Sequence, residues 1–289
     1  MEESKIKKLC NYPIEKLTSF QQTGNIKELL LIEKLEDLNQ LKNIKQKFHI
    51  IGNGSNSIIN STAENTPFIK ISSSFESFKF NPPLVTIGAG VQVNQLLKFS
   101  QENNISGFEF MAGVPASVGG MVSMNFGCWN SEVVDIIESV EVFSFKKGIF
   151  TLTNKECDFN YRTSIFQKNN WIILKATFKI SLLNDPHLIK NKIQHYVKER
   201  VAKQPIRKKT FGSIFKNPKS NTAAKLIEKA GLKGYTKNNV TISNQHANFM
   251  ENINNGSAQN TIELLEFVIE KIHKLFKIKL KPEVVIFND

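Results

Sequence analysis

The order of apolar and polar positions predicts a strand, a helix, a second strand and a glycine loop in the first part of the chain. An apolar run in "IKELLLIEK" precedes leucines at helical spacing, Leu35, Leu38 and Leu41, and "FHIIGNGSN" follows them. Short apolar runs are typical of strands, whereas a spacing of three to four residues is typical of a helix.

The pattern then becomes richer in strands. "FIKIS" and "LVTIGAGV" predict two strands, "VNQLLKFSQENNI" predicts a helix, and a long loop with several glycines follows. The later runs "SVEVFSF", "IFTLT" and "WIILKATFKI" are apolar and β-branched, as in a largely antiparallel sheet.

A second change in the pattern comes at Asp185 and Pro186, which interrupt the last of these strands. Ile189 and Ile193 then recur at helical spacing and predict a helix. We therefore expect a domain boundary after residue 183.

The C-terminal part contains two further helical segments. One begins at Thr222, a residue type that favours helix N-caps, and ends at Gly231 or Gly234. The other runs from about Thr261 to Phe276, and "KLKPEVVIF" forms a strand-like tail.

With 289 residues, 40% hydrophobic and 22% charged, the chain has the composition of a globular protein with two or three domains. No apolar run approaches the ~20 residues of a membrane helix, and the start "MEESKIKKLC" is unlike a signal peptide. Three cysteines, Cys10, Cys128 and Cys157, have no metal-binding spacing, and their odd number argues against a disulfide framework. We therefore expect a cytoplasmic protein without a metal site or membrane association.

Lys and Arg outnumber Asp and Glu by 38 to 26, which gives a net charge of +12. Such an excess suits a nucleic acid, an anionic membrane surface or a phosphorylated small molecule. The lysines are spread in short groups such as "KIKK" and "KIKLK", and an AT-rich genome would also favour Lys, Asn and Ile. The charge alone identifies no partner, and we expect no nucleic acid.

Two glycine-bearing loops could hold a dinucleotide. Residues 51–59, "IGNGSNSII", could cradle phosphate oxygens, although an ordinary turn is the better interpretation of this loop alone. Residues 113–127 add glycines that permit close backbone approach, together with polar side chains. Both loops in one domain favour an extended dinucleotide. The expected contacts are Gly52, Asn53, Gly54, Ser55, Asn56, Gly113, Val114, Ser117, Gly119, Gly120, Asn125 and Gly127.

Four polar residues could carry chemistry, and each also has a structural interpretation. Arg162 in "DFNYRTSIF" lies among apolar residues and needs an anionic or carbonyl partner, which could be structural or functional. Taken alone, Ser213 in "TFGSIFKNP" is a strand-end serine and Glu283 in "KPEVVIF" is a surface acid. His246 in "SNQHANFMEN" suits a hydrogen-bonding role better than catalysis.

Taken together, the motifs resemble the UDP-N-acetylenolpyruvoylglucosamine reductase (MurB) family over nearly the whole chain. In order they are "GNGSN", "GVPASVGGMVSMNFG", "YRTSIF", "KQP", "GSIFKNP", "AAKLIEKAGLKG", "SNQHANFMEN" and "PEV". Each motif is weak alone, whereas the ordered set is specific. The resemblance implies an α+β fold, with a two-subdomain FAD-binding domain of the vanillyl-alcohol-oxidase (PCMH) type and a smaller C-terminal α+β substrate domain.

The resemblance also implies domain boundaries and a reaction. Residues 1–75 and 76–183 would form the two FAD-binding subdomains, and residues 184–289 the substrate domain, whose tail returns to the active site. NADPH would reduce bound FAD and leave. The enolpyruvyl ether of UDP-N-acetylglucosamine would then be reduced to UDP-N-acetylmuramate, a peptidoglycan precursor. We expect a monomer.

Individual roles follow from the same resemblance. Arg162 would stabilise the negative charge that develops on the substrate, and Glu283 would support the same intermediate. Ser213 would donate the proton that completes the reduction. The substrate-binding residues would be Lys203, Asn217 and Tyr161.

The chain departs from the family pattern at three places. "TSFQQTGN" replaces the usual segment near the N-terminus, Ala116 stands where glycine is usual, and "TKNNV" replaces a common glycine pair. The chain resembles the shorter family type, which lacks an extra substrate-covering insertion.

Two other interpretations remain open at this point. The chain could be a related FAD oxidoreductase with another substrate, which substrate-dependent reoxidation of the flavin would distinguish. It could also be a non-enzymatic basic nucleotide- or RNA-binding protein, which would be colourless.

Overall fold

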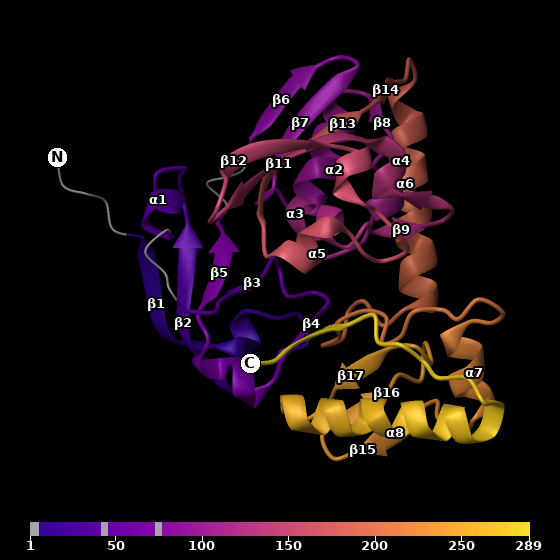
Figure 1. The fold of residues 1–289 in the computed structure, drawn as a ribbon. Coiled ribbons are helices and arrows are strands. Elements are labelled where there is room, and N and C mark those ends of the chain that lie inside the picture. The colour runs from indigo at the N-terminus through magenta and orange to yellow at the C-terminus, as the bar shows by residue number, and fades with distance from the viewer. Residues whose placement is uncertain (1–5, 42–45, 73–76) are drawn as a thin grey trace. The chain divides into compact units, whose positions relative to one another are not determined.

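Figure 1 shows the fold in a computed structural model that describes residues 6–41, 46–72 and 77–289. The chain divides into two compact units. Unit 1 comprises Met1–Leu9, Leu29–Gly52 and Pro67–Lys198, and unit 2 comprises Cys10–Glu28, Asn53–Thr66 and Glu199–Asp289. The chain passes between the units at five points, one of them inside the first glycine loop, after Gly52, and another inside a long helix, after Lys198.

A five-stranded antiparallel sheet with the order β12-β11-β13-β7-β6 forms the centre of unit 1 (Figure 1). Its strands are β6 (Phe78–Asn81), β7 (Leu84–Gly88), β11 (Ile137–Ser144), β12 (Gly148–Thr153) and β13 (Ile172–Lys179). The predicted antiparallel sheet is therefore confirmed. Its inward-facing side chains, such as Val85, Ile87 and Val140, are fully buried in the largest core cluster.

Helices of unit 1 pack their apolar residues into the same cluster. They are α2 (Val93–Glu102), α3 (Val118–Ser123), α4 (Val133–Ile136), α5 (Ile165–Asn169) and the first part of α6 (Pro186–Lys203). Ile189 and Ile193 of α6 are buried, which confirms the helix that their spacing predicts. Two short pairs complete this part: β8 (Ile105–Ser106) with β14 (Ser181–Leu182), and β9 (Gly127–Cys128) with β10 (Ser131–Glu132).

A second sheet has the strand order β1-β2-β5-β3. Its strands are β1 (Lys7–Pro13), β2 (Asn25–Ile32), β3 (His49–Ile50) and β5 (Phe68–Ile71), and β5 runs parallel to β2 and β3. Leu38 and Leu41 of α1 (Asp37–Leu41) are buried beside this sheet, as predicted. The prediction for Leu35 is wrong, because the Asp37 carboxylate accepts the N–H groups of residues 33 and 34 and the helix begins only at Asp37. Leu35 precedes the helix and is 49% exposed.

Unit 2 contains the antiparallel sheet β15-β16-β17 and the helices α7 and α8. The bounds are β15 (Thr236–Lys237), β16 (Val240–Ile242), β17 (Met250–Asn252), α7 (Ala223–Lys229) and α8 (Ala258–Phe276). Thr222 caps α7 and Gly231 follows it with φ +70, as predicted. Helix α8 begins before the predicted Thr261, because Ser257 and Asn260 form a capping box.

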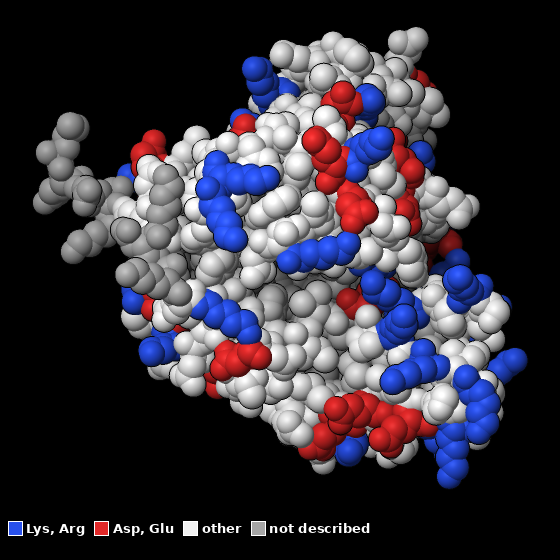
Figure 2. All heavy atoms as spheres, viewed as in Figure 1, with Lys and Arg blue, Asp and Glu red and all other residues white. Residues whose placement is uncertain are grey.

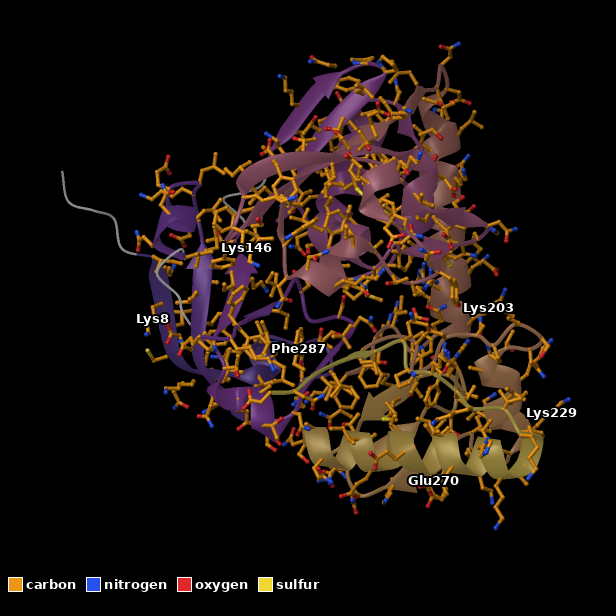
Figure 3. The ribbon with its side chains drawn as sticks, in the orientation of Figure 1. Lys8, Lys146, Lys203, Lys229, Glu270 and Phe287 are labelled. Atoms are coloured by element: carbon orange, nitrogen blue, oxygen red, sulfur yellow. The ribbon has the colours of Figure 1, made fainter. Side chains whose placement is uncertain are left out.

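The C-terminal tail forms β18 (Val285–Phe287), which runs parallel to β4 (Ser57–Ile59). The predicted strand-like tail is thus confirmed, and Figure 3 labels Phe287 at its end. This pairing brings the end of the chain beside the strand that leaves the first glycine loop. Short 3-10 helices occupy Ile14–Lys16, Ser61–Asn65, Glu109–Met111 and Lys155–Cys157.

Candidate active site

Unit 2 places the backbone segment that contains Ser213 beside the one that contains Glu283. On one side of its chain segment, Ser213 forms an antiparallel bridge with Phe249. On the other side, the backbone N–H of Glu283 donates to the carbonyl of Ile214 at 2.9 Å. Two of the three predicted catalytic residues therefore lie on neighbouring backbone segments, and both are partly buried.

Asn56 of the first glycine loop forms hydrogen bonds with the segment that contains Glu283. Its Nδ2 donates to the carbonyl of Glu283 at 3.1 Å, and its own carbonyl accepts the N–H of Val285 at 3.0 Å. A Cβ atom placed on Gly212 would lie 3.9 Å from the carbonyl oxygen of Ser55. Two predicted cofactor contacts, Ser55 and Asn56, thus lie beside the backbone of the predicted catalytic residues.

Gly54 fixes the shape of the same loop. Its φ is +60, and a Cβ there would lie 2.3 Å from the carbonyl oxygen of Leu17 and 2.8 Å from Cα of Thr18. Only glycine fits this close approach. In the described part of the chain, the N–H groups of buried Gly54 and of Ser55 donate to no protein acceptor. They are donors suited to the anionic phosphates of FAD, so the loop fits this cofactor.

In unit 1, the two glycine loops approach each other. A Cβ on Gly52 would lie 3.0 Å from Oγ of Ser117 and 3.8 Å from Cα of Gly120. Ser117 caps α3, and its Oγ accepts the N–H of Gly120 at 3.3 Å. Gly52, Ser117 and Gly120 therefore lie close together, as contact with one extended dinucleotide requires.

The first backbone N–H groups of α3 have hydrogen-bond acceptors within the protein. The N–H groups of Val118 and Gly119 donate to the carbonyls of Val91 and Ala89 at 2.8 and 3.0 Å. A Cβ on Gly119 would lie 2.9 Å from Cβ of Ala89, so glycine at this position permits helix packing. A contact of Gly119 with FAD stays a prediction, as do those of Asn53, Gly113 and Val114.

Asn125 holds the second loop in shape. It is buried, and its Nδ2 donates to Glu132 at 2.9 Å and to the carbonyl of Asn160 at 3.1 Å. Its Oδ1 accepts the N–H of Val134 at 3.0 Å. These bonds tie three segments together, and a direct contact of Asn125 with the cofactor stays a prediction.

Arg162 has the carbonyl partner that its apolar surroundings require. Its Nη2 donates to the carbonyl of Gly127 at 2.6 Å, and its guanidinium carbon lies 5.6 Å from the Phe126 ring centre and 5.3 Å from that of Tyr161. Arg162 also has φ +56, a left-handed conformation that costs a non-glycine residue roughly 1–2 kcal/mol. These contacts hold the guanidinium fork in one place, although Tyr161 itself is 46% exposed.

The predicted substrate-binding residues of unit 2 lie at helix ends. Lys203, labelled in Figure 3, is at the end of α6, where its Nζ pairs with the carboxylate of Glu199. The side-chain oxygen of Asn217 accepts the N–H of Ala223 at 3.0 Å, at the start of α7. Their roles toward a substrate stay predictions.

Two residues of this region were missed by the sequence reasoning. Gln245 donates through Nε2 to the carbonyls of Val201 and Ala202 at the end of α6. Asn248 bonds the chain next to Ser213 through its side chain and backbone. No periodicity or spacing marks either residue, since their partners are distant in sequence.

Basic and acidic side chains both lie on the face drawn in Figure 2. On the face drawn in Figure 2, basic and acidic groups are interspersed with broad uncharged areas. Exposed lysines pair with acids in several places, and such pairs contribute little to stability. They include Lys7–Glu33, Lys168–Asp158, Lys179–Glu138 and Lys233–Glu228.

The described residues contain neither a membrane-spanning helix nor a metal-binding group of side chains. No helix among them is both long and apolar enough for a membrane span. Within the same ranges, no group of three or more His, Cys, Asp or Glu side chains could hold a metal ion.

Comparisons with known proteins agree with this geometry. Residues 204–287 match the C-terminal domain of UDP-N-acetylenolpyruvoylglucosamine reductase, and residues 35–153 match an FAD binding domain. The reductase of Clostridium botulinum strain Okra is 33% identical over 285 residues, which cover 97% of this chain and 92% of that protein. This chain belongs to the UDP-N-acetylenolpyruvoylglucosamine reductase family.

Other members of the family support the assignment. The reductase of Caldicellulosiruptor saccharolyticus is 32% identical over 289 residues, covering 98% of this chain and 93% of that protein. The crystal structure of the MurB enzyme of Thermus caldophilus matches with a TM-score of 0.83 and 25% identity, over 98% of this chain and 99% of that chain. The predicted family and the predicted α+β fold, with an FAD-binding domain and a C-terminal domain, are confirmed. The matched FAD binding domain contains both glycine loops, which confirms FAD as the cofactor.

Proposed function

We propose that this protein catalyses the FAD-dependent reduction of UDP-N-acetyl-3-O-(1-carboxyvinyl)-glucosamine to UDP-N-acetylmuramate with NADPH, in peptidoglycan precursor synthesis. The observation that carries the proposal is the arrangement in unit 2. There, Ser213 and Glu283 lie on paired backbone segments, and Ser55 and Asn56 of the glycine loop adjoin them. Family membership supplies the reaction that this arrangement suits.

When bound, FAD would supply a hydride to the terminal methylene carbon of the enolpyruvyl group. Negative charge then develops on the carbon that bears the carboxylate and on the carboxylate itself. The guanidinium of Arg162, held by Gly127 and two aromatic rings, stabilises this charge because it is fixed before the charge develops.

Ser213 donates a proton to the same carbon. A hydroxyl is a weak acid, so donation requires a strongly basic carbon and an enforced geometry. Backbone pairing on both sides of the segment that contains Ser213 fixes the main chain from which its hydroxyl projects. Glu283 supports the charged intermediate beside it.

We also propose the domain boundaries, the ligand contacts and the partners of the protein. Residues 1–75 and 76–183 form the FAD-binding subdomains, and residues 184–289 form the substrate domain. The residues that contact FAD are Gly52, Asn53, Gly54, Ser55, Asn56, Gly113, Val114, Ser117, Gly119, Gly120, Asn125 and Gly127. Those that bind the substrate are Lys203, Asn217 and Tyr161. The protein acts as a cytoplasmic monomer, with the UDP-sugar and NADPH as its partners and no nucleic acid or membrane.

A product assay tests the proposed function. The purified protein is incubated with NADPH and the enolpyruvyl UDP-sugar, and the products are identified by mass spectrometry. We expect one UDP-N-acetylmuramate for each NADPH consumed. NADPH consumption that is independent of the UDP-sugar would favour another FAD oxidoreductase, and a colourless protein without activity would contradict the proposal.

A further inference from the structure

Asn248 completes the hydrogen bonding of the chain segment that follows Ser213. Its Oδ1 accepts the N–H of Phe215 at 3.0 Å, and its Nδ2 donates to the carbonyl of Phe215 at 2.8 Å. Its backbone carbonyl accepts the N–H of Ile214 at 2.9 Å. One residue therefore makes three hydrogen bonds to the two residues directly after Ser213.

The pairing at the opposite edge of the Ser213–Phe215 segment explains why Phe215 needs a side chain as its hydrogen-bond partner. Phe215 forms a bridge with Pro282, and the hydrogen bonds of this bridge are made by the flanking residues 214 and 216. The N–H and carbonyl of Phe215 are therefore left for the edge where Asn248 lies. There the backbone turns away, because the N–H of Phe249 donates to the carbonyl of His246.

A carboxamide suits this position for a chemical reason. Phe215 is buried and presents one donor and one acceptor, and a carboxamide offers the matching acceptor and donor together. Asn248 is itself only 5% exposed, and its N–H donates to Nδ1 of His246 at 3.2 Å. The bond to His246 thus helps to hold Asn248 in place.

We infer that Asn248 is a positioning residue for the proton donor: it fixes the Ser213–Phe215 segment so that the Ser213 hydroxyl reaches the substrate carbon. The inference rests on the proposed function, in which Ser213 donates its proton to that carbon. The electron pair left on this carbon after hydride addition takes the proton, and the serine oxygen regains a proton from water. Reduction of FAD by NADPH needs no proton from Ser213, so Asn248 affects only the second half of the reaction.

The test uses Asn248→Ala, Ser213→Ala and the double variant as FAD-loaded proteins in anaerobic stopped-flow experiments. We expect Asn248→Ala to reoxidise about 10- to 100-fold more slowly with the UDP-sugar, because small misplacements of a reacting group cost up to that much. Reduction by NADPH is expected to keep its rate. The double variant is expected to be no slower than Ser213→Ala, since both changes remove the same proton transfer.

Asn252→Ala is the matched control. Asn252 is also 5% exposed, and its side chain bonds the backbone of Phe20, Gln21 and Gly256 instead of the Ser213 segment. We expect this control to keep both half-reaction rates, even where its stability falls. A selective loss of reoxidation in Asn252→Ala equal to that in Asn248→Ala would overturn the inference.

Two readouts keep the inference testable if Asn248→Ala folds poorly. Asn248→Asp keeps an acceptor for the N–H of Phe215 but loses the donor to its carbonyl, so we expect slower reoxidation here too. Amide hydrogen exchange at Phe215, followed without any turnover, is expected to accelerate in the Asn248 variants and to stay slow in Asn252→Ala.

The outcomes separate this inference from the proposed function. Wild-type reoxidation in both Asn248 variants, together with slow reoxidation in Ser213→Ala, overturns the role of Asn248 alone. The inference is also overturned if the double variant reoxidises more slowly than Ser213→Ala by the factor seen in Asn248→Ala alone. Asn248 would then act independently of Ser213. Wild-type reoxidation in Ser213→Ala removes the proton donor from the proposed function, and the role of Asn248 falls with it.

Discussion

The backbone N–H of Glu283 donates to the carbonyl of Ile214 at 2.9 Å, which ties the acid near the C-terminus to the residue after Ser213. The parallel pairing of β18 with β4 extends this connection to the strand that leaves the glycine loop. The predicted proton donor, the predicted acid and part of the FAD loop therefore belong to one hydrogen-bonded structure within unit 2.

Replacing Ser213 by Ala is expected to slow reoxidation of the reduced flavin by the UDP-sugar about 10²- to 10⁴-fold, the usual contribution of a positioned general acid. Bleaching of the flavin by NADPH should keep its rate. Anaerobic stopped-flow absorbance measures both steps. Ser181→Ala, at an exposed serine of β14, serves as the control, and an unchanged reoxidation rate in Ser213→Ala would remove Ser213 from the acid role.

Arg162→Lys retains a positive charge but loses the planar fork that bonds Gly127 and lies over the two aromatic rings. We expect kcat to fall about 10²- to 10³-fold, as for loss of a fixed donor that stabilises developing charge. Steady-state kinetics with the UDP-sugar measure the effect. Arg207→Lys, an exposed residue, should leave kcat unchanged; an equal loss in both variants would contradict the role of Arg162.

Gly54→Ala is expected to lower both stability and FAD content, and Gly231→Ala provides the comparison. Both glycines have positive φ, +60 and +70, but a Cβ at Gly54 would lie 2.3 Å from the carbonyl oxygen of Leu17, whereas one at Gly231 meets nothing within 4 Å. We expect Gly231→Ala to cost about 1–2 kcal/mol from its backbone alone. Gly54→Ala should cost a further 1–3 kcal/mol from overpacking. Urea denaturation and flavin absorbance measure the two effects, and equal losses would contradict the close approach.

His246 is expected to make the protein less stable in acid. Burial, followed by the nearby charge of Lys233, lowers the pKa of His246 below its usual value of 6.5. The folded protein therefore binds this proton less readily than the unfolded chain. The stabilising contribution is complete above pH 6.5 and is lost as the pH falls through the lower pKa of the folded state.

His246→Asn tests this pH dependence, because Asn stays neutral and its Oδ1 can replace Nδ1 as acceptor for the N–H of Asn248. Unfolding free energies are measured at pH 5 and pH 8 for both proteins. We expect the wild type to lose more stability than the variant at pH 5. An equal loss in both proteins would show that His246 does not titrate in this way.

Local sequence signals predicted much of the secondary structure. Thr222 and Gly231 act within a few residues of their own positions, so the limits of α7 could be read directly. The spacing of leucines found α1 but misplaced Leu35, because the carboxylate of Asp37 sets where the helix begins. A spacing rule does not include such a side-chain bond.

Long-range pairing could not be predicted in the same way. The tail was identified as a strand, yet its parallel partner β4 lies far away in the sequence and carries no matching local signal. The role of Asn248 was missed for the same reason, since its bonds to Phe215 depend on how two distant segments meet. The resemblance to a family selected Ser213 and Glu283 together, and the structure explains their proximity through the bond between Glu283 and Ile214.

The most direct test of the central claim is the visible absorption of the purified protein through one anaerobic cycle. We predict the spectrum of bound FAD, bleaching on addition of NADPH, and recovery on addition of UDP-N-acetyl-3-O-(1-carboxyvinyl)-glucosamine. A protein without flavin absorption, or a reduced flavin that this UDP-sugar fails to reoxidise, would contradict the claim.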